Sequence, residues 1–382
     1  MAPATRLPVT VVTGFLGAGK TTVLRHLLLN SRQRLAVLVN EFGEVGIDGA
    51  LLRSCGFCPD DELEGRLVEL ANGCLCCTVQ DDFLPTMERL LLRADQLDGI
   101  VVETSGLALP EPLVAAFGWP SIRTRTRVHG VVTVVDGQAL AAGQVVADAS
   151  ALEAQRAADP SLDHLEAIED LFEDQLQAAD LVLISRADQL QGDELDAVRS
   201  RLQRHCRAGT ALLPVANGAV DSELLLGPAL MQRPDQAHAD HDHDDHDHDD
   251  HDEADHGHHG HHDHHDHPDP LETEHDHHDH SHVEIESLAL DLPGHWQQDR
   301  LEAALQQLLS QQAVIRLKGW LSMPAKQRLL QIQAVGPRLH CWYEGESQAP
   351  AAGHQHGQLC LVLLGFGLNR QGIIEALQLA GD

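Results

Sequence analysis

The chain carries the stretch Thr13-Gly14-Phe15-Leu16-Gly17-Ala18-Gly19-Lys20-Thr21-Thr22. An apolar, β-branched run at residues 7–13 leads into it and predicts a buried strand, whereas the Leu-rich run at residues 23–29 that follows predicts a helix. The spacing Gly-x4-Gly-Lys-Thr between a strand and a helix is that of a phosphate-binding P-loop. Its glycines let successive backbone N–H groups point into one concavity, where the helix N-terminus adds positive potential.

This loop predicts a nucleoside triphosphate site. Lys20 is expected to reach the β- and γ-phosphates, and the Thr21 hydroxyl is expected to ligate Mg²⁺. The residues predicted to contact the phosphates are Gly14, Gly17, Ala18, Gly19, Lys20, Thr21 and Thr22. A Gly-rich turn that binds nothing is the alternative, and the strand–loop–helix context argues against it. The motif itself does not distinguish ATP from GTP.

Length and composition set limits on the rest of the chain. Its 382 residues have room for two or three domains, and its formal charge of −33 argues against a nucleic acid or an anionic membrane as partner. The sequence contains no apolar run long enough to span a bilayer and begins with a predicted strand, not a signal peptide. Eight cysteines in a nucleotide-binding chain predict a reducing, cytoplasmic compartment and metal or redox chemistry in place of disulfides.

A candidate switch loop follows the second predicted strand, residues 35–40. Residues 41–48 contain two glycines and three acids, the first of which is Glu41. Such a loop could become ordered when a γ-phosphate and Mg²⁺ are present. A solvated acidic turn is the alternative.

Two cysteine motifs lie between this loop and the next strand. Cys55 and Cys58 form a C-x2-C pair, which could be half of a zinc site, a redox pair or two unrelated cysteines. Cys74, Cys76 and Cys77 are three cysteines within four residues, beside the turn-forming residues 72–73. Three thiolates that converge in a turn suit Zn²⁺ or Co²⁺ in a tetrahedral site, with water, substrate or a switch-loop acid as fourth ligand. Buried, inert cysteines are the alternative.

Two further strands end in candidate ligand-binding residues. Residues 98–103 predict a strand ending at Glu103, from which a carboxylate could hold Mg²⁺ through water while the Gly106 N–H contacts the γ-phosphate. Glu103 could instead simply cap the next turn. Residues 181–184 predict a strand that leads to Arg186 and Asp188. The Asp188 carboxylate could accept two N–H bonds from a guanine edge, which adenine does not offer.

Alternating strands and helices up to residue 215 predict an α/β domain with a mostly parallel sheet over residues 1–230. Residues 231–282 predict a disordered linker, since 19 of the 27 histidines and 17 acids lie within 238–282 almost without apolar residues. This segment is either a solvated spacer or a reservoir for divalent metal. Residues 283–382 then predict a small α+β domain, with strands at 283–290, 314–321, 328–335 and 359–364 and helices at 298–309 and 371–379.

Taken together, these motifs resemble the CobW-type GTPases, a group of P-loop metallochaperones. The resemblance rests on the P-loop, on residues 73–77 (Gly-Cys-Leu-Cys-Cys), on residues 103–106 (Glu-Thr-Ser-Gly), and on a His-rich segment before a small C-terminal domain. Residues 103–110 and 40–48 look like those of the cobalamin-biosynthesis members. One difference concerns the guanine motif, in which the family usually has Lys two residues before Asp, whereas this chain has Arg186 before Asp188.

The resemblance implies a GTPase that supplies Co²⁺ to the cobaltochelatase of cobalamin biosynthesis. It places Mg²⁺ and switch roles on Glu41 and Glu103, and cargo-metal binding on Cys74, Cys76 and Cys77. Because Zn²⁺ outcompetes Co²⁺ at most sites, a zinc chaperone of the same family is the first alternative. A metal buffer acting through its His-rich segment and an ATP-dependent small-molecule kinase are rivals of other classes. The oligomeric state does not follow from the sequence.

Overall fold

The computed structural model of the protein describes residues 6–31, 33–40, 67–70, 83–148, 150, 152, 168–226, 285–323, 326, 328–343 and 357–381. The predicted switch loop, the two cysteine motifs and the His-rich segment lie outside these residues.

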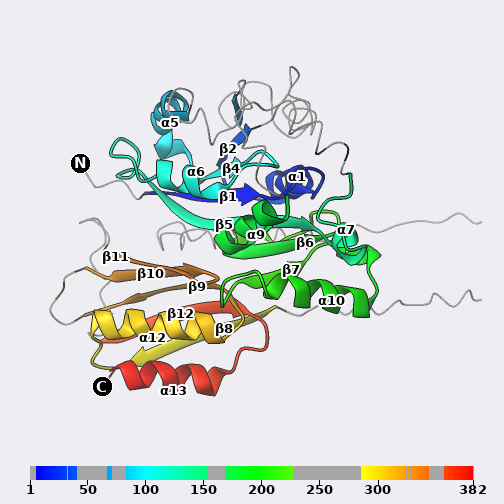
Figure 1. The fold of residues 1–382 in the computed structure, drawn as a ribbon. Helices are drawn as coiled ribbons and strands as arrows, with labels where there is room; N and C mark the ends of the chain where they lie inside the picture. The colour runs from blue at the N-terminus through cyan, green and yellow to red at the C-terminus, as the bar shows by residue number, and fades with distance from the viewer. Residues whose placement is uncertain are drawn as a thin grey trace, which may run out of the picture. The chain divides into compact units, whose positions relative to one another are not determined.

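The first part of the chain forms a seven-stranded sheet in which every pair of neighbouring strands is parallel. The strand order is β3-β2-β4-β1-β5-β6-β7. The strands are β1 (Leu7–Thr13), β2 (Leu35–Asn40), β3 (Leu67–Leu70), β4 (Gly99–Glu103), β5 (Thr126–Asp136), β6 (Leu181–Ser185) and β7 (Ala211–Pro214). The predicted parallel α/β fold is therefore confirmed, and β1, which leads into the P-loop, lies between β4 and β5 (Figure 1).

Helices cover both faces of this sheet, as a parallel sheet requires. On one face, strand residues such as Val12 and Val132 pack with residues of α1 and α11. On the other, the alternate residues Val11 and Val131 pack with α5 and α6, and Ile184 packs with α7, α9 and α10. The helices are α1 (Lys20–Asn30), α5 (Leu84–Leu91), α6 (Pro110–Ala116), α7 (Gly137–Ala141), α9 (Ile168–Ala178), α10 (Gly192–Gln203) and α11 (Ser222–Leu226). The sequence analysis did not predict α5, α7, α11 or β3.

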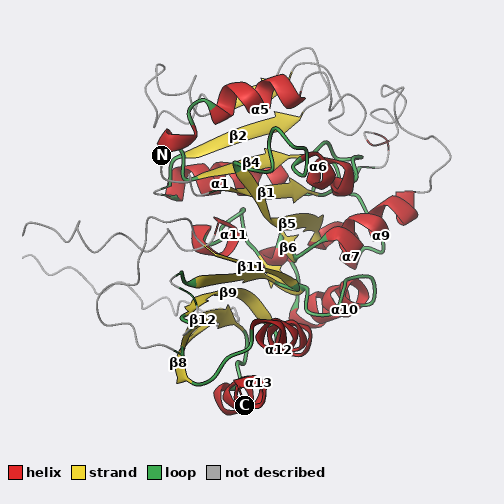
Figure 2. Ribbon diagram, turned by 90° about the vertical axis from the view of Figure 1, so that its left-hand side faces the viewer, coloured by secondary structure: helices red, strands yellow, loops and turns green. Residues whose placement is uncertain are grey.

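The last part of the chain forms a five-stranded antiparallel sheet in the order β11-β10-β9-β12-β8. Its elements are β8 (Glu286–Pro293), α12 (Gln298–Gln311), β9 (Val314–Leu321), β10 (Leu330–Val335), β11 (Arg338–Tyr343), β12 (Gln358–Gly365) and α13 (Arg370–Gly381). Helices α12 and α13 contact each other beside the sheet (Figure 2) and share one apolar core with it. The predicted α+β character is confirmed.

Two details of this second sheet differ from the prediction. Strand β8 begins at Glu286 and continues to Pro293, later than the predicted range 283–290. Strand β11 was not predicted, although Leu339, Cys341 and Tyr343 alternate along it and pack on the core. The turn at Gly336, whose φ is 47°, folds β11 back on β10 as an edge strand.

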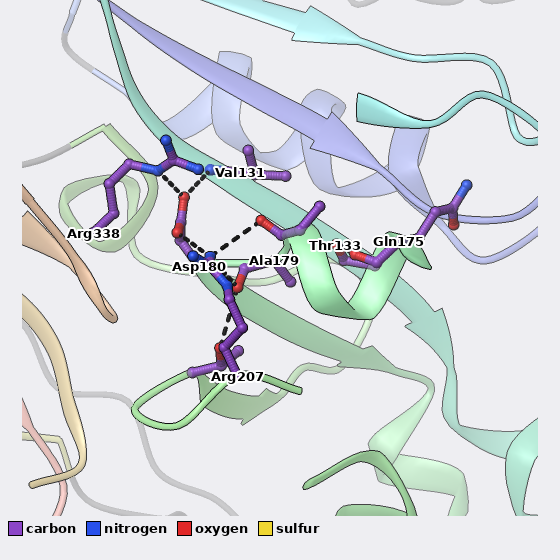
Figure 3. A network of polar contacts seen from close by, with 9 residues as sticks. Val131, Thr133, Gln175, Ala179, Asp180, Arg207 and Arg338 are labelled. Carbon is purple, nitrogen blue, oxygen red and sulfur yellow. Dashed lines mark hydrogen bonds and ion pairs between the residues drawn. The ribbon is translucent and has the colours of Figure 1, made fainter. Parts of the chain in front are cut away.

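A buried carboxylate joins the two sheets. Asp180, fully buried between α9 and β6, accepts hydrogen bonds from the Val131 N–H at 2.8 Å, Arg207 Nη2 at 2.6 Å and Arg338 Nε at 2.5 Å (Figure 3). Arg338 is the first residue of β11 in the second sheet, whereas Val131 belongs to β5 of the first. One side chain therefore connects the second sheet to the middle of the parallel sheet.

A second contact between the sheets buries positive charge. Arg316 of β9 donates from Nε to the Leu224 carbonyl of α11 at 2.7 Å and from Nη1 to Nε2 of His129 on β5. Burial lowers the pKa of Arg316 to about 9. The same burial, together with the neighbouring arginines, holds the pKa of His129 well below its usual value, so this imidazole is neutral.

Candidate functional site

The P-loop connects β1 to α1 at the carboxyl edge of the parallel sheet. Lys20 is almost fully buried, and its Nζ donates to the carbonyls of Gly14 at 2.7 Å and Phe15 at 3.1 Å. Gly14 has a φ of 133°, and a Cβ at this position would lie 2.1 Å from the Val134 carbonyl oxygen of β5. Only glycine allows the loop to turn this close to the neighbouring strand.

The carboxyl end of β4 lies against the first turn of α1. Glu103, which is 5% exposed, has Oε1 at 3.5 Å from the Thr21 hydroxyl. The Thr104 hydroxyl donates to that of Thr13 at 2.8 Å, and the Thr104 N–H donates to Val12. The structure thus brings together two of the predicted Mg²⁺ ligands, Thr21 and Glu103, although 82 residues separate them.

The loop after β4 continues this contact with the P-loop. A Cβ on Gly106 would lie 2.6 Å from the backbone N of Leu16, so the two loops touch through a position that only glycine occupies without displacement. From the opposite side, the fully buried Gln175 of α9 donates its amide to the carbonyls of Gly106 at 3.3 Å and Ala108 at 3.1 Å. Gln175 therefore holds the Gly106 loop against the P-loop.

The predicted guanine-binding pair follows β6. Arg186 donates from Nη2 to the Gly17 carbonyl of the P-loop at 3.2 Å and forms an ion pair through Nη1 with Asp136, the last residue of β5. Asp188 lies in a short 3-10 helix, Ala187–Gln189, with its side chain exposed. The P-loop and Arg186 are in contact, and Asp188 is open to solvent.

The described cysteines do not form a metal site. Burial raises the pKa of Cys206 and of Cys360 to about 11 and that of Cys341 to about 12, so all three remain thiols at neutral pH. Among the residues that the structure describes, no group of three or more His, Cys, Asp or Glu could hold a metal ion.

Several predicted site residues lie outside the described ranges, and their roles stay predictions. They are Glu41, Cys55, Cys58, Cys74, Cys76 and Cys77. Within the described ranges, no helix is long and apolar enough to cross a membrane.

Sequence reasoning missed two residues of this site, Asp136 and Gln175. Asp136 carried a signal, because it is an acid at the end of a buried strand, as Glu103 is. Gln175 carried none, because a single Gln on the buried side of an amphipathic helix does not indicate which loop it contacts.

A parallel sheet with a P-loop at its central strand, and an acid of the neighbouring strand beside the P-loop threonine, defines the class of P-loop nucleoside triphosphatases. The family model "CobW/HypB/UreG, nucleotide-binding domain" matches residues 8–213, and the model "Cobalamin synthesis protein cobW C-terminal domain" matches residues 285–380. This chain belongs to the CobW family of P-loop GTPase metallochaperones.

Two relatives that match by sequence agree with this assignment. A protein of Pseudomonas aeruginosa named "Zinc chaperone CobW" is 41% identical over 387 residues, covering 100% of this chain and 93% of its own length. A protein of the same name from Sinorhizobium sp. is 41% identical and covers 94% of this chain and 92% of its own length. Among solved structures, the Zn(II)-bound YjiA GTPase of E. coli covers 99% of this chain and 100% of its own at 20% identity and a TM-score of 0.37.

Proposed function

We propose that this protein uses GTP binding and hydrolysis to deliver a divalent metal ion to a metal-receiving protein in the cytoplasm. The metal binds to Cys74, Cys76 and Cys77, and Zn²⁺ is the first candidate. The observation that carries the proposal is the joining of three sheet-edge elements at the P-loop: the end of β4, the Gly106 loop and Arg186. The names of the two full-length relatives support zinc, as does the higher affinity of most sites for Zn²⁺ than for Co²⁺.

In this proposal each described site residue has one role. Lys20 contacts the β- and γ-phosphates, the Gly106 N–H contacts the γ-phosphate, and Asp188 accepts the N–H groups of guanine beside Arg186. Thr21 and Glu103 hold Mg²⁺; their hydroxyl and carboxylate oxygens, 3.5 Å apart, are the hard donors that this ion prefers. Mg²⁺ would neutralise charge on the phosphates.

Glu41 and the three cysteines connect the nucleotide to the cargo. The switch loop that begins at Glu41 follows β2, and β2 is the neighbour of β4 in the sheet. The cysteines precede β4 in the chain. When Mg²⁺–GTP orders the switch loop, the three thiolates would converge on the metal. Hydrolysis of GTP would end this convergence and so release the metal.

A second candidate function is delivery of Co²⁺ to a cobaltochelatase. The description of the C-terminal family model, which names cobalamin synthesis, favours it. The cysteines accept either ion, so the two candidates differ in the metal and its recipient and share the same GTP-dependent chemistry.

The test is metal affinity in two nucleotide states. Competition with a chromophoric chelator should show that Zn²⁺ and Co²⁺ bind the full chain more tightly with Mg²⁺ and a non-hydrolysable GTP analogue than with GDP, by a coupling of about 1–3 kcal/mol. The Co²⁺ form should show tetrahedral ligand-field bands and a thiolate charge-transfer band. Equal affinities in the two states would contradict the switch.

Variants of the cysteines and of Lys20 separate the parts of the proposal. Cys76→Ser or Cys77→Ser should weaken the charge-transfer band and leave GTP binding in place; thiolate-free, octahedral Co²⁺ in the wild-type chain would contradict the cysteine site. Lys20→Ala should abolish GTP turnover because it removes the main positive charge on the phosphates. Normal turnover by folded Lys20→Ala protein would contradict the nucleotide assignment.

A further inference from the structure

Asp136 uses both of its carboxylate oxygens in a buried position beside the P-loop. Oδ1 accepts the N–H groups of Gln138 at 3.1 Å and Ala139 at 3.2 Å and so caps α7. Oδ2 accepts Nη1 of Arg186 in an ion pair. The Asp136 side chain is only 3% exposed. The carboxylate is thus held rigidly by the helix, and it holds the arginine in turn.

Arg186 is held at three points. Its backbone is left-handed, with φ 53° and ψ 29°, a conformation that is unfavourable for a non-glycine residue and persists where the surroundings enforce it. Asp136 fixes Nη1, and the Gly17 carbonyl accepts Nη2 at 3.2 Å. The planar fork of arginine can reach a carboxylate and a P-loop carbonyl at once, whereas the single ammonium of lysine offers no plane.

Part of the Arg186 side chain remains exposed. Its side chain is 38% exposed, and the exposed Asp188 lies two residues further along the same loop. A fixed, partly exposed guanidinium plane beside an exposed carboxylate offers a stacking surface and an edge acceptor to one purine base.

We propose that Asp136 is a positioning residue for guanine nucleotides, acting through Arg186. It holds the guanidinium as a flat support for the base and ties this support to the P-loop carbonyl of Gly17. The proposal rests on the guanine-binding role proposed above for Arg186 and Asp188, and it adds a residue that touches no nucleotide atom itself. Asp136 therefore contributes binding free energy that is equal in the ground state and in the transition state.

The experiment uses Asp136→Asn in the full chain. Asn is as good an N-cap as Asp, so α7 keeps its cap while the ion pair with Arg186 is lost. KM for GTP should rise about tenfold, the size of one charge-assisted hydrogen bond, with kcat within about twofold. A fluorescent GDP analogue should lose affinity by the same factor. A fall in kcat at unchanged KM would overturn the proposal.

Inosine triphosphate, which lacks the 2-amino group of guanine, separates support of the base from reading of its edge. Asp136→Asn should raise KM for GTP and for inosine triphosphate by the same factor. Asp188→Asn should raise KM for GTP more than for inosine triphosphate. The reason is that Asp188 accepts a hydrogen bond from the 2-amino group, which only guanine has. An Asp136→Asn effect confined to GTP would overturn the role assigned to the arginine plane.

A double-mutant cycle excludes a merely structural role. In the Arg186→Ala background, Asp136→Asn should have no further effect on KM, whereas independent effects would multiply and overturn the proposal. Arg186→Lys, which keeps the charge for Asp136, should recover part of the affinity lost in Arg186→Ala. Asp98→Asn is the matched control, because Asp98 pairs with Arg34 at the other end of the strands and should leave KM unchanged.

The experiments on Asp136 test this inference independently of the proposed metal delivery. Nucleotide affinity and turnover are measured without cargo metal, so loss of metal coupling with normal Asp136 effects would count against the delivery function alone. Absence of the Asp136 effect with intact metal coupling would count against this inference alone.

Discussion

At the scale of single residues, Asp180 is a charged group through which the two sheets are in contact. Its carboxylate is fully buried and accepts hydrogen bonds from two arginines that are themselves partly exposed, Arg207 and Arg338. Removing this carboxylate leaves the buried Val131 N–H without its acceptor, which costs more than breaking an exposed ion pair.

Asp180→Ala should therefore lower the free energy of unfolding by about 1–3 kcal/mol in chemical denaturation followed by circular dichroism. The control is Asp98→Ala, which breaks the exposed pair with Arg34 and should stay within about 1 kcal/mol of the wild type. Equal losses of unfolding free energy in the two variants would show that the buried network stabilises the fold no more than an exposed ion pair does.

At the scale of elements, α9 links the core of the parallel sheet to the nucleotide site. Gln175 projects from this helix to the carbonyls on either side of Leu107, while its own carbonyl accepts the Thr133 hydroxyl of β5. The helix thus fixes the loop after β4 through a side chain of its buried face.

Gln175→Met, nearly the same shape without the two donors, should lower kcat for GTP hydrolysis and leave GDP affinity close to that of the wild type. The free energy of unfolding should fall by about 1–3 kcal/mol, because buried carbonyls lose their partner. Gln177→Met on the exposed side of the same helix, where the amide donates to His205, is the control and should leave kcat unchanged. A normal kcat in Gln175→Met would contradict the role of α9 in placing the loop.

At the scale of the whole molecule, the contact between the sheets should be sensitive to acid. Burial lowers the pKa of His340 to about 4, aided by Arg127 and Arg338 and opposed by Asp180 and a hydrogen bond with Val128. Burial also lowers the pKa of His129 well below its usual value; the positive groups that add to this effect are Arg316, Arg127, His340 and Lys318.

Because both folded pKa values lie below the unfolded value of about 6.5, the unfolded chain binds protons first as the pH falls. The stability contributed by the neutral histidines is present above about pH 6.5 and is lost as the pH falls towards 4. Denaturation midpoints measured from pH 7.5 to 4.5 should fall, and His340→Gln should flatten part of this slope. Stability that rises on acidification over this window would contradict the prediction.

The His-rich segment should be separable from the GTPase. The two family models leave residues 214–284 unmatched, and residues 238–282 offer few apolar side chains to a core. Deleting 238–282 should leave the GTPase rate and denaturation midpoint almost unchanged, while isothermal titration should lose most weak Zn²⁺ sites and keep one tight site. Loss of the tight site as well would place cargo binding in the segment and contradict the cysteine assignment.

Several features follow from the sequence alone: the P-loop, the alternation that builds a parallel sheet, the small C-terminal α+β unit, and the carboxyl-end placement of Glu103 and Asp188. These features depend on neighbours in the chain, since a P-loop is a local spacing and strand or helix periodicity repeats within a few residues. Strand β11 could have been found by the same periodicity.

Which of these residues lie in contact becomes clear from the folded structure. Strand order and side-chain contacts depend on how distant segments pack against each other. The hydrophobic periodicity of one segment does not indicate which other segment it packs against. Asp136 and Arg186 are 50 residues apart, Gln175 and Gly106 are 69 apart, and Asp180 and Arg338 are 158 apart. Each pair involves a buried polar group, which needs a partner because water is excluded, and the nearest partner in space is remote in sequence.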